Sequence, residues 1–343
     1  MENIRRDHKV HSSYRGKRKR KNKGMLHKCI ALAVVLAAVC FAGIRIFIPV
    51  FDDNLPGLKT EFLGNVYGSG QSASSGGDQE HGIDLGHLYS PYAILLDKGS
   101  GEILAEHNSE DRVYPASLTK IMTALLAIEN TDDLSQTITL PYDIFQPLYE
   151  ENASMAGSQP GEEVEMKSLL YGILLPSGAE CCMAFAEKIA GSEERFVEMM
   201  NDKAKELGMK DTHFCNTTGL HDPDHYSTVK DISILLQYAL ESDDFRQVFC
   251  SSRHSVRPTE QHPEGFTFNS TMFQYMDSTE VVGGEILGGK TGYTEEAGLC
   301  LASLAEVNGR EYILVTAKAN GTHDTEQFHI LDAVNVYSQI GER

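Results

Sequence analysis

Within residues 85–343, apolar residues form short strand-like runs near both ends and helical repeats between them. Residues 92–97 and 102–106 are two such runs around a Gly-rich turn, and residues 299–307 and 312–318 flank an Asn-Gly dipeptide typical of two-residue hairpins. Helical periodicity covers the ranges between, 118–130, 164–175, 179–190, 193–207 and 228–241, with a last helix near 324–340. We therefore expect an α+β domain whose antiparallel sheet is built from both ends of the domain, with a helical region between.

A basic segment and an apolar segment precede this domain. Residues 1–28 hold eleven Lys or Arg against two acidic residues, and residues 29–51 are mostly apolar. The positive-inside rule associates this order with a cytoplasmic N-terminus and an exported remainder. We expect residues 1–28 to be cytoplasmic and residues 29–51 to be a transmembrane signal-anchor, single-pass in the cytoplasmic membrane. An uncleaved anchor is favoured over a cleaved signal peptide, because Ala38-Val39-Cys40 is not a small-x-small cleavage site.

A polar segment separates the apolar segment from the folded domain. Residues 52–84 include a run of Gly and Ser that predicts a flexible linker, and residues 85–343 are the expected extracytoplasmic domain. Beyond residue 28 the chain carries 19 Lys plus Arg against 47 Asp plus Glu. This acidity argues against nucleic acid as a partner and favours solubility of the domain.

Ser117 and Lys120 carry the strongest chemical signal, a Ser-x-x-Lys motif at the start of a strongly apolar predicted helix. Positions i and i+3 share a helix face, so the lysine amine can reach the serine hydroxyl. A lysine of ordinary pKa is a poor base at neutral pH, but burial and a neighbouring cation both favour its neutral form. We therefore expect Ser117 to be the nucleophile of an acyl-transferring enzyme and Lys120 its general base.

A second Ser-x-x-Lys match, Ser227 with Lys230, has a different context. Thr228 and Asp231 have capping-box spacing just before an apolar-periodic run. This match therefore predicts a helix start and not a second nucleophile.

Lys290, Thr291 and Gly292 form a Lys-Thr-Gly string that follows two further glycines. Glycines beside a strand often mark the close approach of another backbone, and a peptide-like substrate fits that role here. Alone, the string would indicate a Gly-rich turn with a solvated lysine. With Ser117 upstream it indicates a substrate-binding segment, and Lys290 is a candidate for the cation beside Lys120.

With these motifs, the chain resembles the low-molecular-mass penicillin-binding proteins, which are serine-type D-alanyl-D-alanine carboxypeptidases, from about Leu85 to the C-terminus. Further matches occur in order at residues 92–97, 101–104, 115–124, 170–178, 201–208, 213–214, 218–220 and 225–228. The resemblance implies the penicillin-binding/beta-lactamase-like (DD-peptidase) fold for residues 85–343, with the nucleophile at the junction of sheet and helical region.

The resemblance also implies a mechanism, acyl transfer through a covalent intermediate on Ser117 that water then releases. Ser177 would relay a proton to the departing D-alanine, and Lys290 with Thr291 would bind its terminal carboxylate. Backbone N–H groups of Ser117 and Tyr293 would hold the oxyanion. The expected partners are a peptidoglycan stem pentapeptide and beta-lactams, which would act as covalent inhibitors.

One position departs from the family pattern. The middle motif of the family is usually Ser-x-Asn, whereas Ala179 follows Ser177 and Gly178. Alanine has no side-chain donor to hold the scissile peptide, and Glu180 or a water is a possible substitute. Two alternatives therefore stay open, a penicillin- or wall-peptide-binding module with weakened turnover and, less favoured, a serine beta-lactamase. The chain lacks the Ser-Asp-Asn and deacylating glutamate motifs that a class A lactamase should carry.

The remaining reactive residue types indicate structure more than chemistry. Five of the seven cysteines lie beyond the apolar segment, and their spacing matches no metal or redox motif, so we expect mostly small core residues. His213, His221 and His225 lie in a turn-rich stretch without a helical His-Glu-x-x-His pattern. We expect neither a metal nor a cofactor.

Overall fold

The computed structural model describes residues 82–343 of the chain. The predicted basic segment, signal-anchor and most of the linker fall on residues 1–81 and lie outside the described residues. In the part that the model describes, no helix combines the length and the apolar character needed to cross a bilayer.

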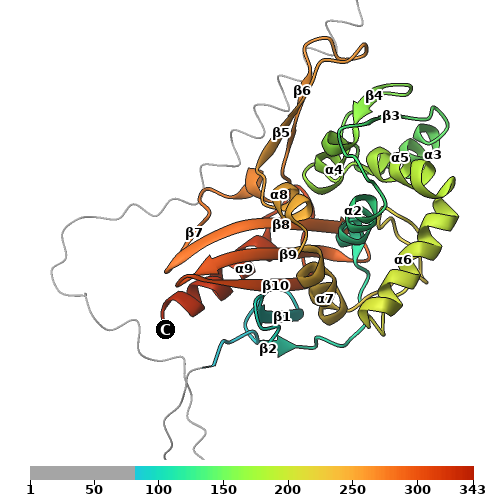
Figure 1. Ribbon diagram of the computed structural model, residues 1–343. Coiled ribbons are helices and arrows are strands. Elements are labelled where there is room, and N and C mark those ends of the chain that lie inside the picture. Colours follow the sequence, from blue (N-terminus) through green and yellow to red (C-terminus); the bar gives the residue numbers. More distant parts are fainter. Residues whose placement is uncertain (1–81) are drawn as a thin grey trace, which may run out of the picture. The chain divides into compact units, whose positions relative to one another are not determined.

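A six-stranded antiparallel sheet with the strand order β2-β1-β10-β9-β8-β7 forms the centre of this region (Figure 1). Its strands are β1 (Tyr92–Asp97), β2 (Ile103–His107), β7 (Glu280–Val281), β8 (Gly284–Thr294), β9 (Gly298–Val307) and β10 (Arg310–Ala319). β1 pairs directly with β10, with Tyr92 opposite Ala317. The prediction of an α+β domain whose antiparallel sheet is assembled from both ends of the domain is confirmed.

Helices and two small hairpins fill the chain between these strands. The helical elements are η1 (Ala116–Thr119), α2 (Lys120–Glu129), α3 (Phe145–Glu150), α4 (Met166–Leu174), α5 (Ala179–Ala190), α6 (Glu193–Leu207), α7 (Val229–Ala239), α8 (Asp243–Phe249) and η2 (Phe273–Tyr275), and α9 (Phe328–Gly341) follows the sheet. The small sheets pair β3 (Thr137–Thr139) with β4 (Glu163–Glu165) and β5 (Arg253–Val256) with β6 (Phe266–Asn269). The predicted helix near 324–340 begins later, at Phe328.

Two hydrophobic clusters cover opposite faces of the sheet, because successive strand residues point to opposite sides. Ile94 and Leu96 of β1 pack with the helical region, whereas Ala93 and Leu95 pack in the cluster that contains α9. In Figure 1, α9 lies along β9 and β10, apart from the group formed by α2 to α6. The sheet is therefore buried on both faces.

The Lys-Thr-Gly string lies within strand β8, which the apolar pattern did not predict as a strand. Lys290 pairs with Ala302 of β9, which belongs to the helix-side cluster. Thr291 pairs with Leu301, which belongs to the α9-side cluster. Opposed residues in a sheet share a face, so Lys290 points toward the helical region and Thr291 toward α9.

Candidate active site

The predicted nucleophile lies in a constrained turn. Ser117 belongs to η1, which leads directly into α2, and Ala116 before it has a φ of 47°, a conformation that few non-glycine residues adopt. Two glycines make room for this turn. A β-carbon on Gly292 of β8 would lie 3.1 Å from the Ser117 nitrogen, and Gly219 packs even more closely against Ala116. The sheet edge and the 217–220 loop thus both contact the backbone that presents Ser117.

Lys120 reaches back to Ser117, as the Ser-x-x-Lys spacing predicts. Its Nζ lies 3.1 Å from Ser117 Oγ and donates a hydrogen bond of 2.6 Å to the carbonyl oxygen of Thr218. The side chain is only 2% exposed. Burial lowers the pKa of Lys120, and this outweighs the opposing influence of the Cys182 and Glu180 side chains. An amine biased toward its neutral form can accept the proton of the Ser117 hydroxyl.

Lys290, the expected neighbouring cation, is itself an amine whose charge is disfavoured. Its side chain is completely buried, and Nζ donates to the Thr291 carbonyl oxygen at 2.7 Å. Burial lowers the pKa of Lys290 well below its ordinary value, and the charge of Lys120 lowers this pKa further. Burial, more than a charged neighbour, therefore favours the neutral form of both lysines.

Ser117 and Lys120 line a cavity of about 610 Å³. Its walls are residues 151–154, 218–221 and 293–295, together with Ala179 and His323. Among the predicted site residues, Tyr293 also lines this cavity, and it lines a smaller neighbouring cavity together with Thr291 and Gly292. Ser177 and Lys290 are buried and line neither of these two cavities.

Ser177 lies in the turn between α4 and α5 with a left-handed φ of 68°. Its hydroxyl is buried and has no hydrogen-bond partner within residues 82–343. Buried polar groups without a partner are uncommon and are often found where function requires them. Ala179 begins α5, and its backbone N–H donates to the carbonyl oxygen of Ser154 in the cavity wall. The position usually held by asparagine lines the cavity and carries only a methyl side chain.

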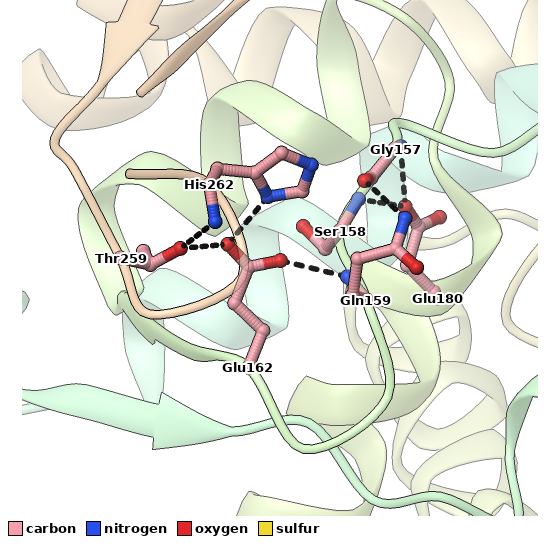
Figure 2. A network of polar contacts seen from close by, with 7 residues as sticks. All are labelled: Gly157, Ser158, Gln159, Glu162, Glu180, Thr259 and His262. Atoms are coloured by element: carbon pink, nitrogen blue, oxygen red, sulfur yellow. Dashed lines mark hydrogen bonds and ion pairs between the residues drawn. The ribbon is translucent and has the colours of Figure 1, made fainter. Parts of the chain in front are cut away.

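Glu180 does not replace the missing amide, because its carboxylate accepts hydrogen bonds from the loop of residues 156–158 instead (Figure 2). It accepts backbone hydrogen bonds from Ala156, Gly157 and Ser158 at 2.8, 2.9 and 3.2 Å. The side chain is fully buried, and burial raises the pKa of Glu180 while the backbone donors oppose this shift. Glu180 thus fixes residues 156–158, which follow the cavity-lining segment.

A second buried carboxylate joins the same loop to the β5–β6 hairpin, as Figure 2 shows. Glu162 is fully buried and accepts hydrogen bonds from the Gln159 backbone N–H at 2.7 Å, from Thr259 Oγ1 at 2.5 Å and from His262 Nδ1 at 2.8 Å. Such donors are what a buried carboxylate requires. Two carboxylates therefore hold the loop that forms one wall of the cavity, a role that the sequence indicated neither for Glu162 nor for Glu180, which it singled out only as a possible substitute for the missing asparagine.

Other residues that the sequence singled out have structural contacts. Thr228 caps α7 by accepting a hydrogen bond from the Asp231 N–H, so the helix-start interpretation of the second Ser-x-x-Lys match is confirmed. Burial lowers the pKa of His225 to about 4, and its Nε2 lies 2.8 Å from Thr119 Oγ1. In the described part of the chain, no three His, Cys, Asp or Glu side chains are grouped so that they could hold a metal ion.

Comparison with known proteins places this arrangement in a family. The model of peptidase family S11, described as D-alanyl-D-alanine carboxypeptidase, matches residues 81–321. The chain belongs to this family. The chain is 35% identical over 236 residues to D-alanyl-D-alanine carboxypeptidase DacF of Bacillus subtilis, covering 66% of the chain and 57% of DacF. It is 31% identical over 245 residues to DacD of Escherichia coli, covering 68% of the chain and 59% of DacD. The chain thus spans less than two thirds of the length of these relatives.

Solved structures confirm the expected DD-peptidase fold. The Streptomyces K15 DD-transpeptidase superposes with a TM-score of 0.66 at 24% identity, covering 74% of this chain and 98% of that one. A D-alanyl-D-alanine carboxypeptidase from Mycobacterium tuberculosis gives a TM-score of 0.66 at 23% identity, covering 77% and 95% of the two chains. At these identities the likeness concerns the fold alone.

Proposed function

We propose that this S11 peptidase is a serine D-alanyl-D-alanine carboxypeptidase that removes the terminal D-alanine of peptidoglycan stem peptides. The observation that carries the proposal is the 3.1 Å contact between Lys120 Nζ and Ser117 Oγ at the wall of an open cavity. Membership of the S11 family and the similarity to named carboxypeptidases support the same substrate class.

The proposed reaction begins when neutral Lys120 takes the proton of Ser117 as Oγ attacks the carbonyl carbon between the two D-alanines. Backbone N–H groups of Ser117 and Tyr293 hold the tetrahedral oxyanion. Ser177 then relays the proton taken up by Lys120 to the amine of the departing D-alanine as its C–N bond breaks, which leaves an ester on Ser117. Water then attacks the ester carbonyl and gives its proton to Lys120, which returns it to Ser117 Oγ as the C–Oγ bond breaks. The shortened peptide leaves with a new C-terminal carboxyl group.

A second candidate function, that of a binding module, follows from Ala179, which lines the cavity at the position where the family usually has an asparagine. Such a module would bind wall peptides without cleaving them, so that penicillin would still acylate Ser117 but no D-alanine would be released from a peptide. Turnover is favoured over this alternative because both serines and both lysines of the family motifs are retained, at Ser117, Lys120, Ser177 and Lys290.

We further propose that the catalytic domain works outside the cytoplasmic membrane, held there by residues 29–51. The support is the order of a basic segment before an apolar one, together with a substrate class that belongs to the cell wall. Fractionation of cells that express the full chain tests this, with alkaline extraction to separate integral from peripheral protein. Recovery in the soluble fraction would contradict the anchor.

The activity is tested by incubating the purified full chain with a stem pentapeptide and measuring free D-alanine. We expect release by the wild type and none above background from Ser117→Ala. Undiminished release by Ser117→Ala would contradict the assigned nucleophile. Stoichiometric penicillin acylation of the wild type without any D-alanine release would instead favour the binding module.

A further inference from the structure

One chemical role in the catalytic cavity is left without its usual residue, the amide that the family pattern has at position 179. Ala179 lines the cavity and has no side-chain donor or acceptor. The neighbouring Glu180 is committed to the backbone of residues 156–158. A replacement for the amide must therefore come from another part of the cavity wall, and it needs both an N–H donor and a carbonyl acceptor.

Asn152 lines the same cavity and carries such an amide. Of the described residues that line this cavity, Asn152 alone has a side-chain amide. The residue is exposed, and its side chain forms no hydrogen bond within residues 82–343. Both its donor and its acceptor are therefore available to a ligand in the cavity.

The segment that carries Asn152 is bonded directly to the start of α5, where Ala179 lies. The Ala179 N–H donates to the Ser154 carbonyl oxygen at 2.8 Å, and Glu180 holds the backbone of residues 156–158 (Figure 2). Ser154 follows Asn152 by two residues, so their Cα atoms are at most about 7 Å apart. An asparagine side chain at position 152 can therefore reach a substrate that is bound beside Ala179.

The backbone of Asn152 is fixed at the end of α3. Its φ is 52°, a left-handed conformation, and its N–H donates to the Tyr149 carbonyl oxygen at 3.2 Å. The next N–H, that of Ala153, donates to the Leu148 carbonyl oxygen at 2.9 Å. Helices commonly end in this way, usually with glycine and only sometimes with asparagine at the left-handed position. The turn itself thus needs no side chain, which favours a role for the amide in the cavity.

We propose that Asn152 supplies the substrate-binding amide that Ala179 lacks. Its NH₂ group donates to a backbone carbonyl oxygen of the stem peptide, and its carbonyl oxygen accepts a backbone N–H of the same peptide. These two hydrogen bonds orient the scissile carbonyl toward Ser117 Oγ, and such orientation raises the rate of attack. The inference rests on the proposed carboxypeptidase function and deepens it by naming a residue that holds the substrate.

The test measures kcat/KM for release of D-alanine from acylated L-Lys-D-Ala-D-Ala by the full chain and its variants. Asn152→Gly removes the amide and keeps a residue that favours the left-handed turn. Asn152→Asp keeps the size of the side chain but lacks the N–H donors. The matched control is Asn308→Gly, because Asn308 has nearly the same φ of 53° in the turn between β9 and β10 and does not line the cavity.

A double variant, Asn152→Gly with Ala179→Asn, tests whether the amide is the group that matters. It moves the amide back to the position that the family uses. An amide in either place can hold the same peptide, so the double variant should recover activity that Asn152→Gly has lost. A purely structural role of Asn152 predicts no such recovery, because the two changes would then add independently.

We expect Asn152→Gly and Asn152→Asp each to lower kcat/KM by about tenfold or more, the loss that follows removal of one positioned hydrogen-bond donor. The urea midpoint of Asn152→Gly should stay close to that of the wild type, because glycine suits the left-handed backbone at least as well as asparagine. The double variant should recover most of the lost activity, and Asn308→Gly should keep all of it.

The proposal is overturned if Asn152→Gly keeps the wild-type kcat/KM, or if the double variant recovers none of the activity that Asn152→Gly has lost. A wild type that releases D-alanine and is insensitive to both changes at position 152 contradicts the amide assignment alone. A wild type that releases no D-alanine contradicts the proposed function itself, and the assignment with it. Should the double variant fail to fold, as judged by circular dichroism, Asn152→Asp decides, since its full activity would overturn the proposal.

Discussion

Gly219 packs so closely against Ala116 that a β-carbon on Gly219 would lie 1.8 Å from the Ala116 carbonyl oxygen. Both residues have positive φ, 81° for Gly219 and 47° for Ala116. The backbone that presents Ser117 therefore depends on a loop far away in the sequence that has no side chain at the point of contact.

Gly219→Ala should abolish most acylation, because the methyl group cannot be accommodated without moving the backbone next to Ser117. A displacement of about 1 Å at a reacting group can cost about a hundredfold in rate. The measurement is the second-order rate constant for acylation by a labelled penicillin.

The control for this variant is Gly191→Ala, at a glycine with a similar φ of 78° and no heavy atom within 4 Å of the added carbon. It shares the backbone strain but lies at the end of α5. We expect a modest loss of stability with normal acylation. Equal acylation rates for the two variants would contradict the role assigned to the Gly219 contact.

The acylation rate should rise with pH through the lowered pKa of Lys120. Burial lowers this pKa below the ordinary value of 10.5, so the neutral amine that accepts the Ser117 proton becomes populated at a correspondingly lower pH. The rate is then expected to level off below pH 10.5. Lys120→Met should remove this dependence along with most of the rate.

Lys230→Met is the matched control, because Lys230 belongs to the second Ser-x-x-Lys match and forms an ion pair with Glu110. Its pH profile should match the wild type. A wild-type rate that continues to rise up to pH 10.5 would contradict the lowered pKa of Lys120, and a pH dependence that persists in Lys120→Met would contradict its role as the base.

Ser177→Ala should separate activity from stability. The Ser177 hydroxyl is buried without a partner, so its removal is expected to leave the free energy of unfolding unchanged or to raise it by about 1 kcal/mol. D-Alanine release should nevertheless fall by about tenfold or more, the typical loss for a missing proton-transfer group. Urea unfolding and the D-alanine assay are the two measurements. A variant that is less stable but fully active would contradict the proton relay.

His262→Ala should destabilise the protein by removing one donor from the buried Glu162 carboxylate. A buried acceptor that loses its partner costs about 1–3 kcal/mol, which urea unfolding would detect. Hydrogen exchange in residues 151–162 should also accelerate, because Glu162 holds this loop. Glu264→Ala, at an exposed position of the same hairpin, should change neither quantity. Unchanged exchange in the His262 variant would show that the hairpin does not hold the cavity wall.

Much of the sheet and most long helices were predictable because their apolar patterns are local. The Asn-Gly turn predicted the β9–β10 hairpin, and the predicted helix at 193–207 matches α6 (Glu193–Leu207). Strand β8 was not predicted, since its glycines hide the alternation of buried and exposed side chains. The β5–β6 hairpin was missed as well, because its two strands pair across a long polar tip.

The candidate site was predictable where chemistry depends on spacing along one helix, as for Ser117 and Lys120. It was not predictable where it depends on segments far apart in the sequence. The Thr218 carbonyl that accepts from Lys120 is 98 residues away from it, and Glu162 meets His262 across 100 residues. The burial of Lys290 also could not be predicted from the sequence, because the Lys-Thr-Gly string does not show which face of β8 is covered.

Mass spectrometry of the penicillin-treated full chain tests the central claim most directly. The account predicts one covalent adduct per chain, located after proteolysis on the peptide that contains Ser117, and no adduct on that peptide in Ser117→Ala. An adduct located on any other residue of the folded wild type, or none at all, would contradict it.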